Sequence, residues 1–162
     1  MRRLIKRIYT LKVFIIVGRL LFTSSRFKSV EIFSLGLARF YAWTVTLVHG
    51  KNHTQTPQKI AEEWRRLMPT PHSHFPIVGG DDRTAYMEIR IHCPLRGSGD
   101  PLACWRSMEF DRALMRGTGG RLLVMESQSV TGNDFCRLAI RRENDSFDDL
   151  PVAHPRWLQE ER

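Results

Sequence analysis

Apolar residues recur at helical intervals in the first half of the chain. Between Glu31 and His49 they follow one another roughly one turn apart, and Gly50 comes directly after, so the pattern predicts a helix over this range. A second helix is predicted over Pro57–Met68, because Thr56 can cap it and proline is favoured at the first helical position. A stretch rich in proline and glycine, residues 69–82, then interrupts regular structure and ends the helical half.

The second half changes to the alternation that is typical of strands. Residues 84–93 alternate apolar and polar side chains and predict a half-buried strand that closes at Cys93 and Pro94. A helix follows over residues 100–116, with an acidic N-cap and proline at its first position, and a glycine-rich run ends it. Two further strands are predicted over 121–129 and 134–142, joined by a turn at 131–133. The C-terminal half therefore has the order β-α-β-β. The whole pattern predicts an α+β fold in which N-terminal helices pack on a small, mainly antiparallel sheet.

Charge divides the chain in a way that hydrophobicity does not. The 162 residues carry a net charge of +8, and the excess lies in residues 1–28, which hold eight basic residues and no acidic one. We predict a basic N-terminal segment over 1–28, a single α+β domain over 29–142 and an acidic, loosely held C-terminal tail over 143–162. Because residues 29–162 together carry 17 basic and 17 acidic residues, nucleic acid is not an expected partner. For the basic segment we expect an N-terminal helix that packs on the domain with its charges in solvent, and peripheral membrane contact is the alternative.

Cysteine usage and the lengths of apolar runs bear on the compartment. Three cysteines are too few for a disulfide scaffold, and an odd number cannot all pair with one another. The cysteine count therefore favours reduced thiols in a cytoplasm. The longest candidate for a membrane span or a signal-peptide core, residues 11–22, is short, is interrupted by Lys12 and Arg19, and lacks an Ala-x-Ala cleavage site. We therefore predict a cytoplasmic protein, with membrane-peripheral contact through residues 1–28 as the alternative.

Candidate chemistry gathers between the first cysteine and the last. Cys93 ends the first predicted strand and Cys104 begins the following helix, so their thiols are expected to face one another across the short loop between them. Asp111 lies on the same helical stripe as Cys104, and Cys136 lies on the last strand. The loop itself is glycine-rich and comprises Arg96, Gly97, Ser98 and Gly99.

Three interpretations of these residues stay open. In the first, Cys93 or Cys104 is a nucleophile whose pKa the helix N-terminus lowers, the loop binds a carboxylate or an oxyanion, and Asp111 moves the proton. Glu109 and His92 are nearby candidates for the same proton transfer. In the second, the cysteines ligate a metal or cluster with a fourth ligand from His72, His74, His92 or Asp111, although the spacing C-x10-C-x31-C matches no common zinc pattern. In the third, the thiols only fill space in the core.

The runs EIRIHCPL, ACWRSMEFD and GGRLLVMESQSVTGNDFCRLAIRR resemble the L-2-amino-thiazoline-4-carboxylic acid hydrolase-like family over residues 84–142. The positions that match are Cys93, Pro94, Cys104, Asp111, Gly132 and Cys136. The resemblance implies an α/β fold and hydrolysis of a cyclic amidine-type carbon–nitrogen bond in a small sulfur-containing amino acid. The order of helix and strands and the cysteines are also similar to the 4-vinyl-reductase-like domains.

The leading functional hypothesis from the sequence is therefore a hydrolase with Cys93 or Cys104 as nucleophile and Asp111 as base or orienting group. The loop over residues 96–99 and Cys136 would contact the substrate. The alternative is a non-enzymatic binding or sensor module that holds a small ligand, a metal or a cluster at the same thiols. The sequence assigns no cofactor and no oligomeric state.

Overall fold

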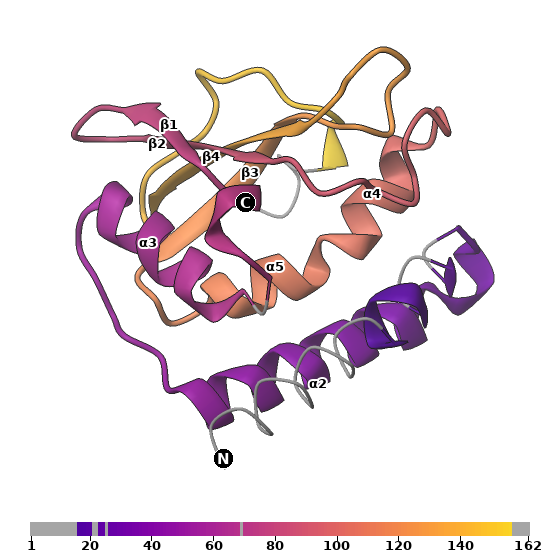
Figure 1. The fold of residues 1–162 in the computed structure, drawn as a ribbon, viewed down its shortest axis with the longest axis horizontal. Helices are drawn as coiled ribbons and strands as arrows, with labels where there is room; N and C mark the ends of the chain where they lie inside the picture. The colour runs from indigo at the N-terminus through magenta and orange to yellow at the C-terminus, as the bar shows by residue number, and fades with distance from the viewer. Residues whose placement is uncertain (1–15, 21–22, 25, 69, 157–162) are drawn as a thin grey trace.

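The computed structural model describes residues 16–20, 23–24, 26–68 and 70–156, and Figure 1 shows their arrangement. The described part contains a four-stranded antiparallel sheet with helices packed on it, which confirms the predicted α+β class. The helices are α2 (Glu31–His49), α3 (Pro57–Leu67), α4 (Pro101–Ser107) and α5 (Glu109–Met115), with short 3-10 turns η1 (Lys28–Val30) and η2 (His72–His74). The strands are β1 (Ile77–Gly80), β2 (Ala85–Ile89), β3 (Gly120–Glu126) and β4 (Cys136–Arg142).

The sheet has the order β1-β2-β4-β3, so the last strand lies in its interior. Its register places Ile89 of β2 opposite Cys136 of β4, which brings the first and third cysteine-bearing segments together. Strand β1 lies where glycine and proline argued against regular structure. It forms because Asp81 accepts hydrogen bonds from the N–H groups of Arg83 and Thr84, and the resulting turn returns the chain as β2.

The helix that the sequence predicted over residues 100–116 is divided into two. The backbone of Met108 leaves the α region (φ −75°, ψ 1°), so α4 ends at Ser107 and α5 begins at Glu109. The N-terminal cap of α4 is as expected, since Asp100 accepts a hydrogen bond from the N–H of Ala103 at 2.8 Å.

The helices form two layers on one face of the sheet. Helices α3 and α5 lie against the strands, and α2 packs on the outer side of α4 and α5 (Figure 1). Helix α3 approaches the start of β3 so closely that a Cβ atom added to Gly120 would lie 2.5 Å from Ile60 Cγ2. The main core fills the space between sheet and inner helices, with Trp64, Leu138 and Ile140 fully buried.

Helix α2 is apolar on both faces, and the side chains that predicted it mostly point outward. Its inner face is built from small and medium residues such as Ala38, Ala42 and Val45. The large apolar side chains lie on the outer face and are exposed, namely Ile32, Phe33, Phe40, Trp43 and Leu47. Among the described helices, none is long and apolar enough to cross a membrane.

Residues 143–156, which the sequence suggested would be loosely held, pack against the rest of the domain. Phe147 is fully buried, and the guanidinium groups of Arg121 and Arg141 lie over its ring. Arg141 also forms a bidentate ion pair with Asp149. Further on, Arg156 donates to Glu31 of α2 at 2.7 Å, so the chain is anchored as far as Arg156.

Candidate functional site

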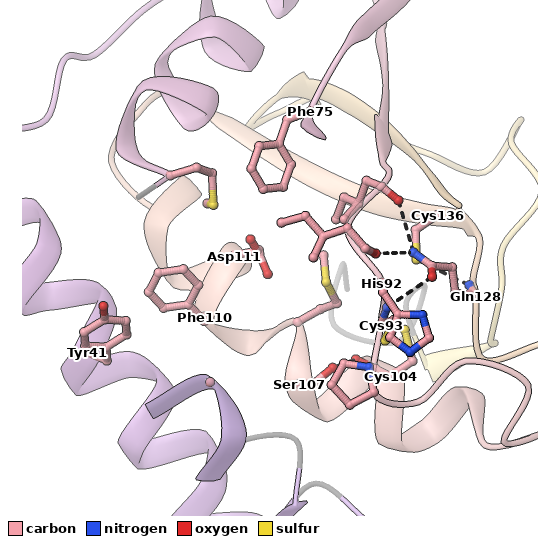
Figure 2. Close-up of a pocket in the computed structure, with 16 residues that line it drawn as sticks. Tyr41, Phe75, His92, Cys93, Cys104, Ser107, Phe110, Asp111, Gln128 and Cys136 are labelled. Atoms are coloured by element: carbon pink, nitrogen blue, oxygen red, sulfur yellow. Dashed lines mark hydrogen bonds between the residues drawn. The ribbon is translucent and has the colours of Figure 1, made fainter. Parts of the chain in front are cut away.

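A cavity of about 160 Å³ brings together four of the residues that the sequence singled out, namely Cys93, Cys104, Asp111 and Cys136. It lies between helices α4 and α5, the chain that follows β2 and the loop between β3 and β4 (Figure 2). Most of its lining is apolar, from side chains such as Phe75, Ile89, Met108 and Phe110. Gly18, from the helical residues 16–20, also lines it. An apolar cavity of about 150 Å³ holds a molecule the size of benzene, so a small organic ligand fits here.

Asp111 provides the ionisable carboxyl group among the cavity-lining residues. It lies on the first turn of α5 and points into the cavity, toward the space between Phe75, Phe110 and the thiols (Figure 2). Burial among these apolar groups raises the pKa of Asp111 to about 7, although the nearby indole of Trp64 and the charge of Arg112 oppose the shift. The carboxyl group is therefore divided between neutral and ionised forms near pH 7. This is the protonation behaviour expected of a group that exchanges protons or binds a cation.

The three thiols line the same cavity: Cys93 and Cys104 lie close as their spacing suggested, and Cys136 joins them because β4 pairs with β2. Each sulfur accepts one hydrogen bond: Cys93 from the N–H of Leu95 at 3.4 Å, Cys104 from the hydroxyl of Ser127 at 3.1 Å, and Cys136 from the N–H of Gln128 at 3.4 Å. All three are free thiols.

Burial nevertheless keeps the thiols neutral. It raises the pKa of Cys104 to about 12 and that of Cys136 to about 11, and it also raises the pKa of Cys93. The neighbouring thiols add to the shift at Cys104 and Cys136. The structure therefore gives no activated thiolate, and the lowered cysteine pKa expected from the helix N-terminus is not found.

Gln128 forms hydrogen bonds to the backbone of several residues that line the cavity. The sequence analysis did not indicate this residue. Its side-chain oxygen accepts from the N–H of Cys93 at 3.2 Å, and its amide nitrogen donates to the carbonyls of Ile89 and Ile91 at 3.2 and 2.9 Å. The side chain thus completes the backbone hydrogen bonds of the chain just after β2 ends. The sequence feature that could have indicated Gln128 is the polar run of residues 127–129 directly after the apolar strand β3. The structure buries all three of these residues, so their side chains need hydrogen-bond partners within the protein.

The loop of Arg96, Gly97, Ser98 and Gly99 does not form the expected anion cradle. Its backbone N–H groups are all bonded within the protein: those of Gly97 and Gly99 to the carbonyls of Gln128 and Ser129, and the other two to residues 93 and 95. The four residues are exposed and do not line the cavity, and Arg96 pairs with Asp134. The loop fastens the β3–β4 connection in place, because its glycine amides supply hydrogen bonds that the buried residues 127–129 need.

Of the other candidates for proton transfer and metal binding, only His92 lines the cavity. Glu109 is fully buried, and three arginines, Arg39, Arg112 and Arg116, pair with it. Burial alone would raise the pKa of Glu109, but these arginines outweigh it and hold the pKa below its ordinary value. His92 lies at the cavity edge and is exposed, whereas His72 and His74 lie on η2 outside it. Within the described ranges, no group of three or more His, Cys, Asp or Glu side chains is arranged to hold a metal ion.

The site is thus a small apolar cavity lined by three neutral thiols and by the carboxyl group of Asp111, which changes its protonation state near pH 7. Residues that sequence reasoning missed, such as Tyr41, Phe75 and Phe110, come from three separate segments of the chain and share no local pattern. Comparison of the chain with protein-family models, with curated proteins and with solved structures finds no match in any of the three.

Proposed function

We propose that the cavity binds a small molecule with an apolar body and one basic carbon–nitrogen group, such as an amine or amidine. The observation that carries this proposal is the position of Asp111, whose carboxyl group faces an otherwise mostly apolar cavity. A bound cation would draw Asp111 into its ionised form, and the two charges would pair where water does not compete. The apolar walls would hold the remainder of the ligand by burial.

Benzamidine is a suitable probe, because it combines a benzene ring with an amidinium group. We expect it to raise the melting temperature and to bind measurably by calorimetry. Neutral benzamide and anionic benzoate, which have the same shape, should bind at least ~10-fold more weakly. Affinity for benzamidine should also rise between about pH 5 and pH 8, since binding favours the ionised form of Asp111, whose pKa is about 7.

The matched variants are Asp111→Asn, which keeps the shape of the side chain, and Glu109→Gln, which removes a carboxylate outside the cavity. Benzamidine binding should be lost in the first and kept in the second, provided that both remain folded. Equal binding of the three probes, or benzamidine binding that survives in Asp111→Asn, would show that the carboxyl group does not select the ligand.

A second candidate function is hydrolysis of the carbon–nitrogen bond in such a ligand, as the family resemblance implies. The observation that favours it is again at Asp111, because a general base works best with a pKa near the ambient pH, and this one is about 7. In this form of the hypothesis Asp111 accepts a proton from water, and Cys93, the least buried thiol, is the remaining candidate for a nucleophile.

The test is the consumption of a cyclic amidine, 2-amino-thiazoline-4-carboxylate, by purified protein. We expect Asp111→Asn to abolish turnover. Cys93→Ser separates the two routes: it should abolish turnover if the thiol attacks and leave it intact if Asp111 activates water. An unreactive wild type that still binds benzamidine would leave the binding proposal standing and remove the enzymatic one.

A further inference from the structure

The outer face of α2 is a continuous apolar surface on a helix whose other face is already packed. Ile32 is 90% exposed, and Leu47 is 69% exposed at the far end of the helix. Phe33, Phe40 and Trp43 lie between them and are 57–67% exposed. Residues at these spacings share one side of an α-helix, so the five large side chains form a single stripe. Among the described elements in Figure 1, this helix forms the outermost layer, with α5 on its inner side.

The charges around this stripe favour one kind of occupant. Between Ile32 and Val48 the only charged residue of α2 is Arg39, a cation. The acidic residue at the start of the helix, Glu31, is turned inward, where it pairs with Arg106 and Arg156. The chain that leads into the helix, residues 1–28, contains eight basic residues and no acidic one. An apolar stripe that carries no carboxylate and follows a strongly basic segment is complementary to an anionic lipid surface.

We propose that the outer face of α2 docks on an anionic membrane surface, with residues 1–28 providing the electrostatic attraction. A second copy of the chain is the less favourable occupant, because two such faces in contact would bring two basic segments together, whose like charges repel. The helix would lie in the membrane interface and not across it, since Ala38, Ala42 and Val45 on its inner face are buried in the protein core. Aromatic side chains such as Trp43 and Phe40 are favoured at that depth.

The direct test is co-sedimentation of the full-length protein with vesicles of phosphatidylcholine, alone or with about 30% phosphatidylserine. We expect partition onto the anionic vesicles to be at least ~10-fold stronger than onto the neutral ones and to weaken with salt. Emission from Trp43 should shift to shorter wavelength on binding, and Trp43→Phe should remove most of the shift while the protein still binds.

Charge placed on the stripe should prevent insertion. Phe40→Glu combined with Leu47→Glu should weaken partition by at least ~10-fold, because each change removes a large apolar group from the lipid contact. The matched control is Val78→Glu on β1, an apolar residue that is 45% exposed and lies away from α2. It should bind as the wild type does. Circular dichroism and thermal unfolding would show that the double variant is folded, as expected for exposed positions.

Replacement of Arg2, Arg3, Lys6 and Arg7 by glutamine should reduce the preference for anionic vesicles and the salt dependence. Equal partition onto both kinds of vesicle, no partition at all, or unchanged binding by the stripe variant would each overturn the proposal. A wild-type dimer in sedimentation equilibrium that the stripe variant converts to a monomer, without vesicle binding, would identify a second copy as the occupant and would also overturn it.

Discussion

The titration of Asp111 should make the free energy of unfolding depend on pH, and Asp111→Asn should remove this contribution. Asp111→Asn keeps the size of the side chain and its ability to face the cavity, but it cannot ionise. The pKa of Asp111 is raised from 3.8 to about 7 by burial in the folded protein. The folded state therefore holds an extra proton between these two pH values, and stability must fall as pH rises through this window.

The size of the effect follows from the difference between the two pKa values. A difference of about 3 units corresponds to roughly 4 kcal/mol between the fully protonated and the fully ionised limits. About 3 kcal/mol of this develops between about pH 4.5 and pH 8.5. For a small domain with a total stability of roughly 5–15 kcal/mol, such a change is readily measured.

The measurement is urea unfolding of both proteins across this pH range, followed by tryptophan fluorescence. The difference in unfolding free energy between variant and wild type is the informative quantity, because contributions from all other titrating groups cancel in it. We expect the variant to gain about 3 kcal/mol relative to wild type as pH rises from about 4.5 to 8.5. Asp82→Asn, at an exposed position in the turn before β2, controls for the loss of one carboxylate from the protein surface.

A constant difference across the range would show that Asp111 is ionised throughout, with solvent reaching its carboxyl group. A difference of the opposite sign would mean that a cation within the protein pairs with it. Either result would refute both the raised pKa and the role given to this residue in ligand binding.

Three further predictions concern the packing around the cavity. Iodoacetamide at pH 7.5 should alkylate Cys93 before Cys104 and Cys136, and all three slowly, as mass spectrometry of peptides from the digested protein would show. A fast reaction at Cys104 would contradict its raised pKa. Gly120→Ala should lower the free energy of unfolding by about 1–3 kcal/mol, because the added Cβ atom collides with Ile60. Gly36→Ala should raise the free energy of unfolding by about 0.5–1 kcal/mol, because the added Cβ atom meets no other atom and alanine favours the helix. Glu109→Gln should destabilise the protein by roughly 2 kcal/mol in urea unfolding, because the buried Arg112 loses its partner; an unchanged midpoint would contradict this.

The class of fold and most element positions follow from local rules that the structure obeys. Helix α2 has the predicted bounds, and α3 begins at the predicted proline, because caps and apolar periodicity act over a few residues. Strand β1 was missed since glycine and proline lower its local propensity, and its pairing with β2 overrides that preference. The break at Met108 also left no clear local signal, because no glycine or proline marks it and Arg106, Met108 and Glu109 are good helix formers.

The candidate site could be predicted in part. Cys93, Cys104 and Asp111 line one cavity, since a strand end and the following helix are joined by a short loop, and Cys136 joins them because β4 pairs with β2. The contribution of Gln128 depends on where β3 ends, and the wall from Phe75 and Tyr41 depends on how distant elements pack. The role expected of Gly97 and Gly99 was wrong for the same reason: a glycine-rich loop exposes N–H groups, but only the tertiary structure decides whether another backbone segment takes them.

The protonation of Cys104 shows why the chemistry of this cavity centres on a carboxyl group. A cysteine near a helix N-terminus is expected to ionise readily, because the unpaired N–H groups there carry partial positive charge. Helix α4, however, has only 7 residues, and the carboxylate of Asp100 caps its first turn, which offsets that charge. Burial then decides the outcome and raises the pKa of Cys104 to about 12. The same burial moves the pKa of Asp111 to about 7, since desolvation favours the neutral form of every acid. One physical effect therefore makes the thiols inert at neutral pH and brings the carboxyl group into the range where it can gain or lose a proton.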